Sequence, residues 1–190
     1  MNRAVAERPD EPVIERVLFS EGQIRARIQS LAAEISQDYA GADLVMAGIL
    51  KGAQLFTCDL ARSLRVPVSV DFLSLSRYKR SPQTRVVEIT QDLEASIAGR
   101  DLLLVEDIVD TGLTLHYLIQ QLTERAPRSI SVCSLLDRSA LRLADIPLRY
   151  AGFHVNEEFL VGYGLDYRER FREAPCISVL SREGWASPAE

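Results

Sequence analysis

The segment 101–115 places the strongest constraint on what this chain can fold into. Residues 101–105, Asp-Leu-Leu-Leu-Val, form an almost wholly apolar run that is too short for a helix. Runs of this kind are typical of strands that are buried on both faces, as in a parallel sheet. Apolar residues then recur at helical spacing at Leu115, Leu118, Ile119 and Leu122. The segment therefore predicts a buried strand, a polar turn and a helix.

The turn between this strand and this helix carries residues that suit a phosphate. Asp110, Thr111, Gly112 and Thr114 stand just before the helical spacing begins. Backbone N–H groups at a helix N-terminus bind phosphate dianions, and Gly112 allows a ligand to approach closely. Glu106 and Asp107, expected directly after the strand, would repel a bare phosphate but can bind ribose hydroxyls or Mg²⁺. The residues alone leave a second interpretation open, in which a buried strand ends in solvated acids and an ordinary helix cap.

The rest of the chain alternates between strand and helix patterns. Apolar or alternating runs predict strands at 13–19, 44–50, 67–73, 85–90, 129–136, 149–153 and 177–180. Ser20 and Gln23 have the spacing of a capping box, which predicts a helix directly after them, and a second helix is expected at 55–64. This order predicts an α/β fold with a mostly parallel sheet. Ligands of such sheets bind at the carboxyl ends of the strands, where Lys51, Glu106 with Asp107, and Asp137 with Arg138 are expected.

Bulk properties narrow the functional classes. A chain of 190 residues is one domain by size, and a net charge of −5 gives no overall attraction to nucleic acid or membranes. No apolar run reaches the length of a membrane span. Residues 1–12 are polar and predict a loosely attached arm before a single domain at 13–190, and the basic stretch 74–83 predicts a flexible loop or hairpin. Cys58, Cys133 and Cys176 lie in apolar segments and predict reduced, buried thiols in a cytoplasmic protein.

The string Val105-Glu-Asp-Ile-Val-Asp-Thr-Gly-Leu-Thr114 resembles the phosphoribosyl-diphosphate signature of the type I phosphoribosyltransferases, and most of all the hypoxanthine/guanine branch. Further matching segments follow the family's order: Leu50-Lys51-Gly52, Val70-Asp71-Phe72, Leu136-Asp137-Arg138 and the segment 159–167. The likeness runs from about residue 13 to residue 181. It implies a type I phosphoribosyltransferase fold: a mostly parallel central sheet flanked by helices, a small hood built from the chain ends, and a flexible loop. It also implies a homodimer or homotetramer.

The resemblance implies a reaction and a set of site residues. The reaction transfers a 5-phosphoribosyl group from phosphoribosyl diphosphate to a 6-oxopurine, giving inosine or guanosine monophosphate and pyrophosphate, with Mg²⁺ as cofactor. Asp110 is the implied general base, taking a proton from N7 of the purine. The peptide before Lys51 is often cis in this family. The implied residues for phosphoribosyl diphosphate or nucleotide are Lys51, Gly52, Tyr78, Glu106, Asp107, Asp110, Thr111, Gly112, Leu113, Thr114 and Arg172. The implied purine-binding residues are Arg138, Phe159 and Leu160. The implied metal ligands are Glu106 and Asp107 and, at a second Mg²⁺ site near pyrophosphate, Asp166.

Two departures from the family pattern leave the substrate open. Arg138 stands where the family usually has a lysine that donates to the 6-oxo group, and a guanidinium fork is wider than a compact ammonium. Preference among hypoxanthine, guanine, xanthine or another purine is therefore undecided. Arg77-Tyr78 replaces the usual Ser-Tyr pair, and Lys79 and Arg80 follow it. This basic stretch favours one further alternative, a nucleotide-sensing regulator that binds RNA.

Overall fold

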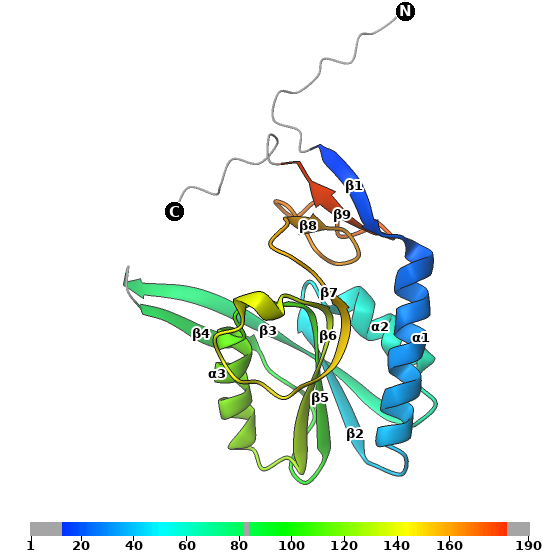
Figure 1. Cartoon of the computed structure of the whole chain (residues 1–190). Coiled ribbons are helices and arrows are strands. Elements are labelled where there is room, and N and C mark those ends of the chain that lie inside the picture. Colours follow the sequence, from blue (N-terminus) through cyan, green and yellow to red (C-terminus); the bar gives the residue numbers. More distant parts are fainter. Residues whose placement is uncertain (1–12, 82–83, 182–190) are drawn as a thin grey trace, which may run out of the picture.

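A six-stranded sheet forms the centre of the molecule in the computed structural model, which describes residues 13–81 and 84–181 (Figure 1). The predicted arm at 1–12 lies outside these ranges. The strands follow the order β4-β3-β2-β5-β6-β7, and each neighbouring pair is parallel except β3 with β4. Their bounds are β2 Leu44–Leu50, β3 Val68–Ser81, β4 Thr84–Gln91, β5 Asp101–Val109, β6 Ser129–Asp137 and β7 Leu148–His154. The predicted mostly parallel α/β sheet is confirmed.

Helices cover both faces of this sheet (Figure 1). Helices α1 (Glu21–Asp38) and α2 (Gln54–Ser63) pack on one face, and α3 (Leu113–Thr123) packs on the other. Because successive strand residues point to opposite faces, β5 contributes Leu103 and Val105 to one cluster and Leu102 and Leu104 to the other. The predicted capping box at Ser20 is present and begins α1. Every strand segment that the apolar pattern predicts as buried thus has helices to cover it.

A small antiparallel sheet made from both ends of the described chain forms a hood over the carboxyl ends of the central strands (Figure 1). Its order is β1-β9-β8, with β1 at Ile14–Phe19, β8 at Leu160–Val161 and β9 at Ile177–Leu180. A 3₁₀ turn, η1 (Ser139–Leu141), follows β6. The hood expected from the chain ends is therefore confirmed.

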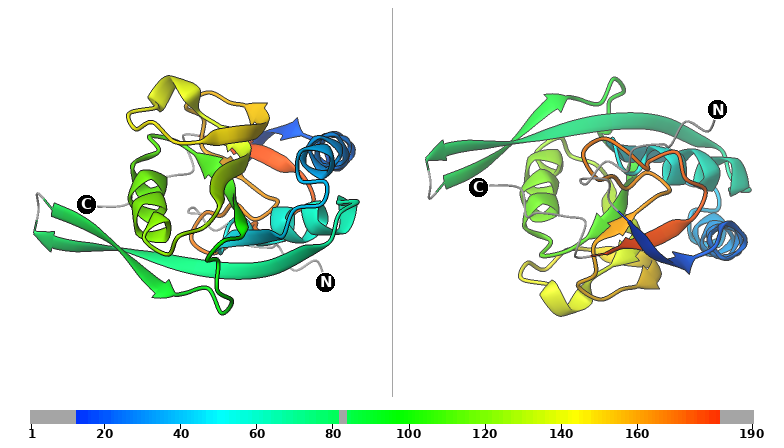
Figure 2. Two further views of the ribbon diagram at one scale, coloured as in Figure 1. Left: turned by 90° about the horizontal axis from the view of Figure 1, so that it is seen from below. Right: turned by 90° about the horizontal axis from the view of Figure 1, so that it is seen from above.

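Three expectations need correction. β3 continues past the predicted strand end at residue 73 to Ser81 and pairs with β4, so of the loop or hairpin expected at 74–83 the structure has a projecting hairpin, with residues 82–83 outside the description (Figure 2). Its polar residues are compatible with strand because an antiparallel ribbon can face solvent. β5 runs to Val109, so Glu106 and Asp107 lie inside the strand and not after it. Cys58 is exposed, because α2 buries Phe56, Thr57 and Leu60 on its other face.

The described helices include none that is long and apolar enough to cross a membrane.

Candidate active site

A cavity of about 260 Å³ opens where β5 passes into α3. It is lined by residues 106–112, 114 and 115, which include both acids of the strand end and the whole polar turn. Residues that the sequence pattern selected for a phosphate therefore do surround one cavity. Leu113, also in the predicted set, points outward with 55% of its surface exposed.

Gly112 makes the turn at the base of this cavity possible. It is the N-cap residue of α3 and has φ +77°, a left-handed conformation that side chains disfavour. A Cβ atom here would also lie 3.0 Å from Cδ of Arg142 and 3.2 Å from the carbonyl oxygen of Ala144. The first turn of α3 thus begins at the cavity. Asp110 is not the helix cap, since the capping position falls two residues after it.

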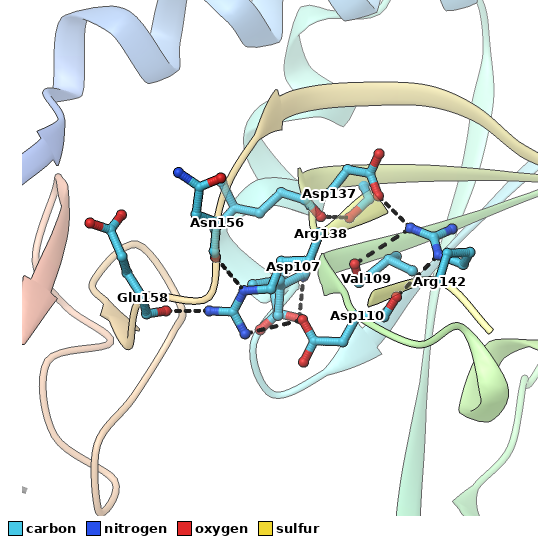
Figure 3. A network of polar contacts seen from close by, with 11 residues as sticks. Asp107, Val109, Asp110, Asp137, Arg138, Arg142, Asn156 and Glu158 are labelled. Carbon is cyan, nitrogen blue, oxygen red and sulfur yellow. Dashed lines mark hydrogen bonds and ion pairs between the residues drawn. The ribbon is translucent and has the colours of Figure 1, made fainter. Parts of the chain in front are cut away.

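Arg138 connects Asp110 to the loop that carries the predicted purine-binding residues (Figure 3). Its Nη1 donates to Oδ1 of Asp110 at 3.1 Å, and its Nε donates to the carbonyl oxygen of Asn156 at 3.0 Å. Its Nη2 donates to the carbonyl oxygen of Glu158. Only 15% of the Arg138 side chain is exposed, whereas 46% of the Asp110 side chain is. The guanidinium is therefore held in place, and the carboxylate remains open to a ligand.

A second arginine, Arg142, holds the backbone of Asp110 (Figure 3). Its Nε donates to the carbonyl oxygen of Asp110 at 3.1 Å, and its guanidinium pairs with the carboxylate of Asp137. The side chain of Asp137 is only 6% exposed and also lies 3.1 Å from Nδ1 of His154. Buried carboxylates are retained where cations and hydrogen bonds satisfy them. Asp137 therefore fixes the position of Arg142.

Gly52 lies between Asp107 and Gly164. A Cβ atom on Gly52 would overlap the carboxylate of Asp107, and one on Gly164 would overlap the carbonyl oxygen of Gly52. The peptide between Leu50 and Lys51 is cis, as the family resemblance of the sequence implied. Three segments from distant parts of the chain thus meet through contacts that leave no room for side chains.

The carboxyl group of Asp107 is desolvated by this packing. Burial raises its pKa to about 6, against the opposing effects of an N–H donated by Ile108 at 2.8 Å and the positive charge of Arg172. Nearby Asp110 raises the pKa further. The raised pKa is typical of a carboxyl group kept at a site for chemistry rather than for stability.

Two cations and two acids meet beside the Gly52 loop. Lys51 Nζ lies 3.0 Å from Oε2 of Glu169, and Arg172 Nη2 lies 3.3 Å from Oε1 of the same carboxylate. Arg172 also lies 2.7 Å from Oδ1 of Asp166 and donates to the carbonyl oxygen of Gly164 at 2.7 Å. The hydrogen bonds from Lys51 and Arg172 lower the pKa of Glu169. A lysine and an arginine converging on one acidic group can also converge on a diphosphate.

Comparison with known proteins shows the family to which this chain belongs. The family model described as "Phosphoribosyl transferase domain" matches residues 18–168, most of the chain. This chain belongs to the phosphoribosyltransferase family. Among curated relatives, hypoxanthine-guanine phosphoribosyltransferase of Mycobacterium tuberculosis is 45% identical over 174 residues, covering 88% of this chain and 86% of the relative. The enzyme of that name from Bacillus subtilis is 42% identical over 168 residues, covering 88% and 93%.

Solved structures agree with this phosphoribosyltransferase assignment. The crystal structure of a hypoxanthine phosphoribosyltransferase from Staphylococcus aureus matches with a TM-score of 0.87 and 38% identity, covering 92% of this chain and 95% of that one. A mutant hypoxanthine phosphoribosyltransferase from Trypanosoma cruzi, in a ternary complex with substrates, matches with a TM-score of 0.86 and 38% identity, covering 91% and 98%. The fold is thus the type I phosphoribosyltransferase fold, as the sequence motifs implied.

The expected purine side of this phosphoribosyltransferase lies in the loop before β8. Phe159 is partly buried and meets Tyr167 edge to face, with ring centroids 5.7 Å apart. Leu160 is buried at the start of β8. Tyr78 lies in β3, but its side chain is outside what the structure describes. The loop that Arg138 binds through its carbonyl groups therefore leads directly into Phe159 and Leu160.

The three predicted metal ligands occupy two separate positions. Within 13–81 and 84–181 there is no group of three or more His, Cys, Asp or Glu side chains that could hold a metal ion by themselves. Glu106 and Asp107 are neighbours on β5, whereas Asp166 pairs with Arg172 and accepts a hydrogen bond from the backbone N–H of Glu169 at 2.8 Å. The carboxylates thus stand in two separate places around the cavity region.

Sequence reasoning missed three residues that contact the candidate site residues: Arg142, Glu169 and Gly164. Arg142 could have been suspected, because a buried acid at the end of β6 requires a counter-charge from a nearby turn. Glu169 stands in a charge-rich run, where one acid is indistinguishable from its neighbours. Gly164 belongs to a matched segment, but its close approach to Gly52 depends on how the chain ends fold together.

Proposed function

We propose that this phosphoribosyltransferase is a purine salvage enzyme. It transfers the 5-phosphoribosyl group of phosphoribosyl diphosphate to hypoxanthine or guanine, forming the nucleoside monophosphate and pyrophosphate. The observation that carries the proposal is the position of the Asp110 carboxylate, which is open to solvent at the phosphate cradle and faces Arg138. The names of the relatives at 41–45% identity support the same reaction.

Asp110 is the general base in this proposal. N9 of the purine attacks C1′ of the sugar while the bond from C1′ to the diphosphate oxygen breaks. The purine then carries excess positive charge until the proton on N7 passes to the carboxylate. Arg138 holds Asp110 through one N–H and the loop before Phe159 through two others, so the base and the purine platform are positioned together. In this proposal Phe159 stacks on the purine and Leu160 contributes backbone groups to its edge.

Lys51 and Arg172 bind the diphosphate end of the substrate in this proposal. The transition state develops positive charge on the sugar and negative charge on the leaving group, so cations held in place beforehand stabilise it. Both cations now bind Glu169, which the diphosphate oxygens replace. The segment 110–114 binds the 5-phosphate, Gly52 lets the diphosphate approach the backbone, and Tyr78 covers the site.

The donor set fits Mg²⁺. This ion takes oxygen ligands and is usually held by one or two carboxylates together with substrate phosphates and water. Glu106 and Asp107 supply such oxygens beside the cradle, and Asp166 supplies another beside Arg172. In this proposal these residues hold the ribose hydroxyls and Mg²⁺, and bound Mg²⁺ neutralises charge on the diphosphate. We further propose a cytoplasmic homodimer or homotetramer.

A second base preference is supported by Arg138. Its guanidinium is bound to the carbonyl oxygens of Asn156 and Glu158 and to Asp110, so it presents its remaining N–H groups in a fixed direction. A lysine would rotate its ammonium freely. We therefore keep a second proposal beside hypoxanthine and guanine, in which the enzyme prefers another purine base such as xanthine.

The test is incubation of the purified protein with phosphoribosyl diphosphate, MgCl₂ and each purine base in turn, with nucleotides separated by chromatography. Product from hypoxanthine or guanine, abolished by EDTA, supports the main proposal. Product from xanthine or another base alone supports the shifted preference. No product with any base overturns the enzyme proposal, and RNA binding that weakens with salt would then support a regulator.

A further inference from the structure

Three consecutive backbone carbonyl groups where β5 passes into the phosphate cradle, those of Val109, Asp110 and Thr111, are bound by one neighbouring segment, residues 138–144. The backbone N–H of Arg138 donates to the carbonyl oxygen of Val109 at 2.9 Å. Nε of Arg142 donates to the carbonyl oxygen of Asp110 at 3.1 Å. The backbone N–H groups of Leu143 and Ala144 donate to the carbonyl oxygen of Thr111 at 2.9 and 3.0 Å. Three consecutive carbonyl groups therefore point toward the same segment.

This arrangement decides where the N–H groups of the cradle point. A trans peptide is planar, so its N–H points away from its C=O. Among the described residues the one cis peptide joins Leu50 to Lys51, so the peptides of 109–112 are trans. Holding the carbonyl groups of residues 109–111 therefore directs the N–H groups of residues 110–112 to the opposite side. Those residues line the cavity at the start of α3.

Arg142 is the one side chain among these four donors, and it is itself held in place. Its side chain is 20% exposed, and its guanidinium pairs with Asp137, whose side chain is 6% exposed. It also packs with Cδ beneath Gly112, where the glycine has no Cβ. The position of this guanidinium is thus fixed from two sides, by charge and by packing.

We propose that Arg142, anchored by Asp137, is a positioning residue that aims the amide donors of the cradle at the 5-phosphate. It acts through the Asp110 carbonyl group and touches no substrate atom. The inference rests on the proposed function, because it concerns how the same site binds the phosphate of phosphoribosyl diphosphate and of the nucleotide product. It predicts that removing Arg142 weakens ligands that carry a 5-phosphate and spares those that lack one.

The experiment compares inosine monophosphate with inosine, which differ only in the phosphate. Titration calorimetry of the full chain measures the affinity for inosine monophosphate, and competitive inhibition measures the affinity for inosine. For Arg142→Gln we expect inosine monophosphate to bind about tenfold more weakly, the effect of one well-placed hydrogen bond to a charged group. The inhibition constant of inosine stays at the wild-type value, and KM for phosphoribosyl diphosphate rises without a change in KM for the purine.

The matched control is Arg125→Gln. Arg125 also forms a two-point pair with a carboxylate, Asp92, at 2.7 and 2.9 Å, but it lies just after the far end of α3. This variant should bind both ligands as the wild type does. Equal losses for inosine monophosphate and inosine in Arg142→Gln, or no loss for either, would overturn the inference.

Loss of Arg142 leaves Asp137 as a buried charge with fewer partners, so a second variant guards against misfolding. The double variant Asp137→Asn with Arg142→Gln removes that charge. It should melt nearer to the wild-type temperature than Arg142→Gln does and keep the selective loss for inosine monophosphate. Wild-type affinity for inosine monophosphate in a folded double variant would overturn the inference. If instead the wild type itself fails to prefer inosine monophosphate over inosine, the proposed function fails.

Discussion

The α-carbon of Gly164 packs against the carbonyl oxygen of Gly52, and no side chain fits between them. Gly52 follows the first strand of the central sheet in chain order, whereas Gly164 follows β8 in the hood. The contact therefore fastens the hood to the loop that carries Lys51. On the other side, Gly52 meets the carboxylate of Asp107, so the three-segment contact also reaches β5.

Gly164→Ala should lose stability for two reasons, a strained backbone and an overlap of the new side chain with Gly52. The residue has φ +99°, and its new Cβ would overlap the Gly52 carbonyl oxygen. We expect a loss of roughly 1–2 kcal/mol from the left-handed backbone and about 1–3 kcal/mol more from the overlap, measured by chemical denaturation. KM for phosphoribosyl diphosphate should rise, because the Lys51 loop moves. Gly99→Ala is the control, since Gly99 has φ +72° with no atom within 4 Å of the added Cβ, and it should show the backbone cost alone. Equal losses in the two variants would contradict the packing argument.

Asp110→Asn should lower turnover far more than it weakens binding of phosphoribosyl diphosphate. An amide keeps the shape of the carboxylate but cannot accept the purine proton, and general-base catalysis contributes roughly 10²–10⁴-fold. Steady-state kcat and a direct titration with phosphoribosyl diphosphate make the measurement. Asp92→Asn, at the Arg125 pair, is a control that should keep the wild-type rate. A rate for Asp110→Asn equal to that of the wild type would remove this residue from the mechanism.

Arg138→Lys should change the ranking of purine bases and spare the sugar phosphate. Lysine retains the positive charge but lacks the forked guanidinium. It therefore cannot bind the Asp110 carboxylate and the carbonyl oxygens of Asn156 and Glu158 in the same geometry. The ratio of kcat/KM values for hypoxanthine, guanine and xanthine measures the effect, with KM for phosphoribosyl diphosphate as the internal control. If the ranking stays the same, Arg138 does not read the base.

Asp107→Asn should stabilise the protein at neutral pH and lose this advantage in acid. Burial raises the pKa of Asp107 to about 6 from its ordinary 3.8, so the folded state holds the proton more tightly than the unfolded state does. Its contribution favours the fold below pH 4 and is lost as the pH rises through 6, so the charged form opposes folding at pH 7. We expect the variant to gain about 1–3 kcal/mol at pH 7, which is the size of such a shift, and little at pH 4. Denaturation curves at the two pH values measure the gain. A gain that is the same at both would show that the charge of Asp107 is not its cause.

Local patterns in the chain determined the secondary structure and the main parts of the site. The apolar run at 101–105 could only be buried between two layers, and helical spacing after Thr114 required a helix whose N-terminus faces the preceding turn. Because strand ends of a parallel sheet share one edge, the polar residues after β2, β5 and β6 had to meet there. Asp110, the cradle and Arg138 are readable from sequence for this reason.

Only the tertiary structure decided which groups hold these residues in place. Charge alone does not reveal that Arg142 reaches the Asp110 carbonyl group, that Glu169 lies between Lys51 and Arg172, or that Gly164 closes on Gly52. The tertiary structure likewise extended β5 through Glu106 and Asp107, since pairing with β6 continues past Val105, the last residue of the apolar run, to Val109. Periodicity reports which face of an element is buried. The partner of a side chain depends on how segments distant in sequence pack, and that information is not local.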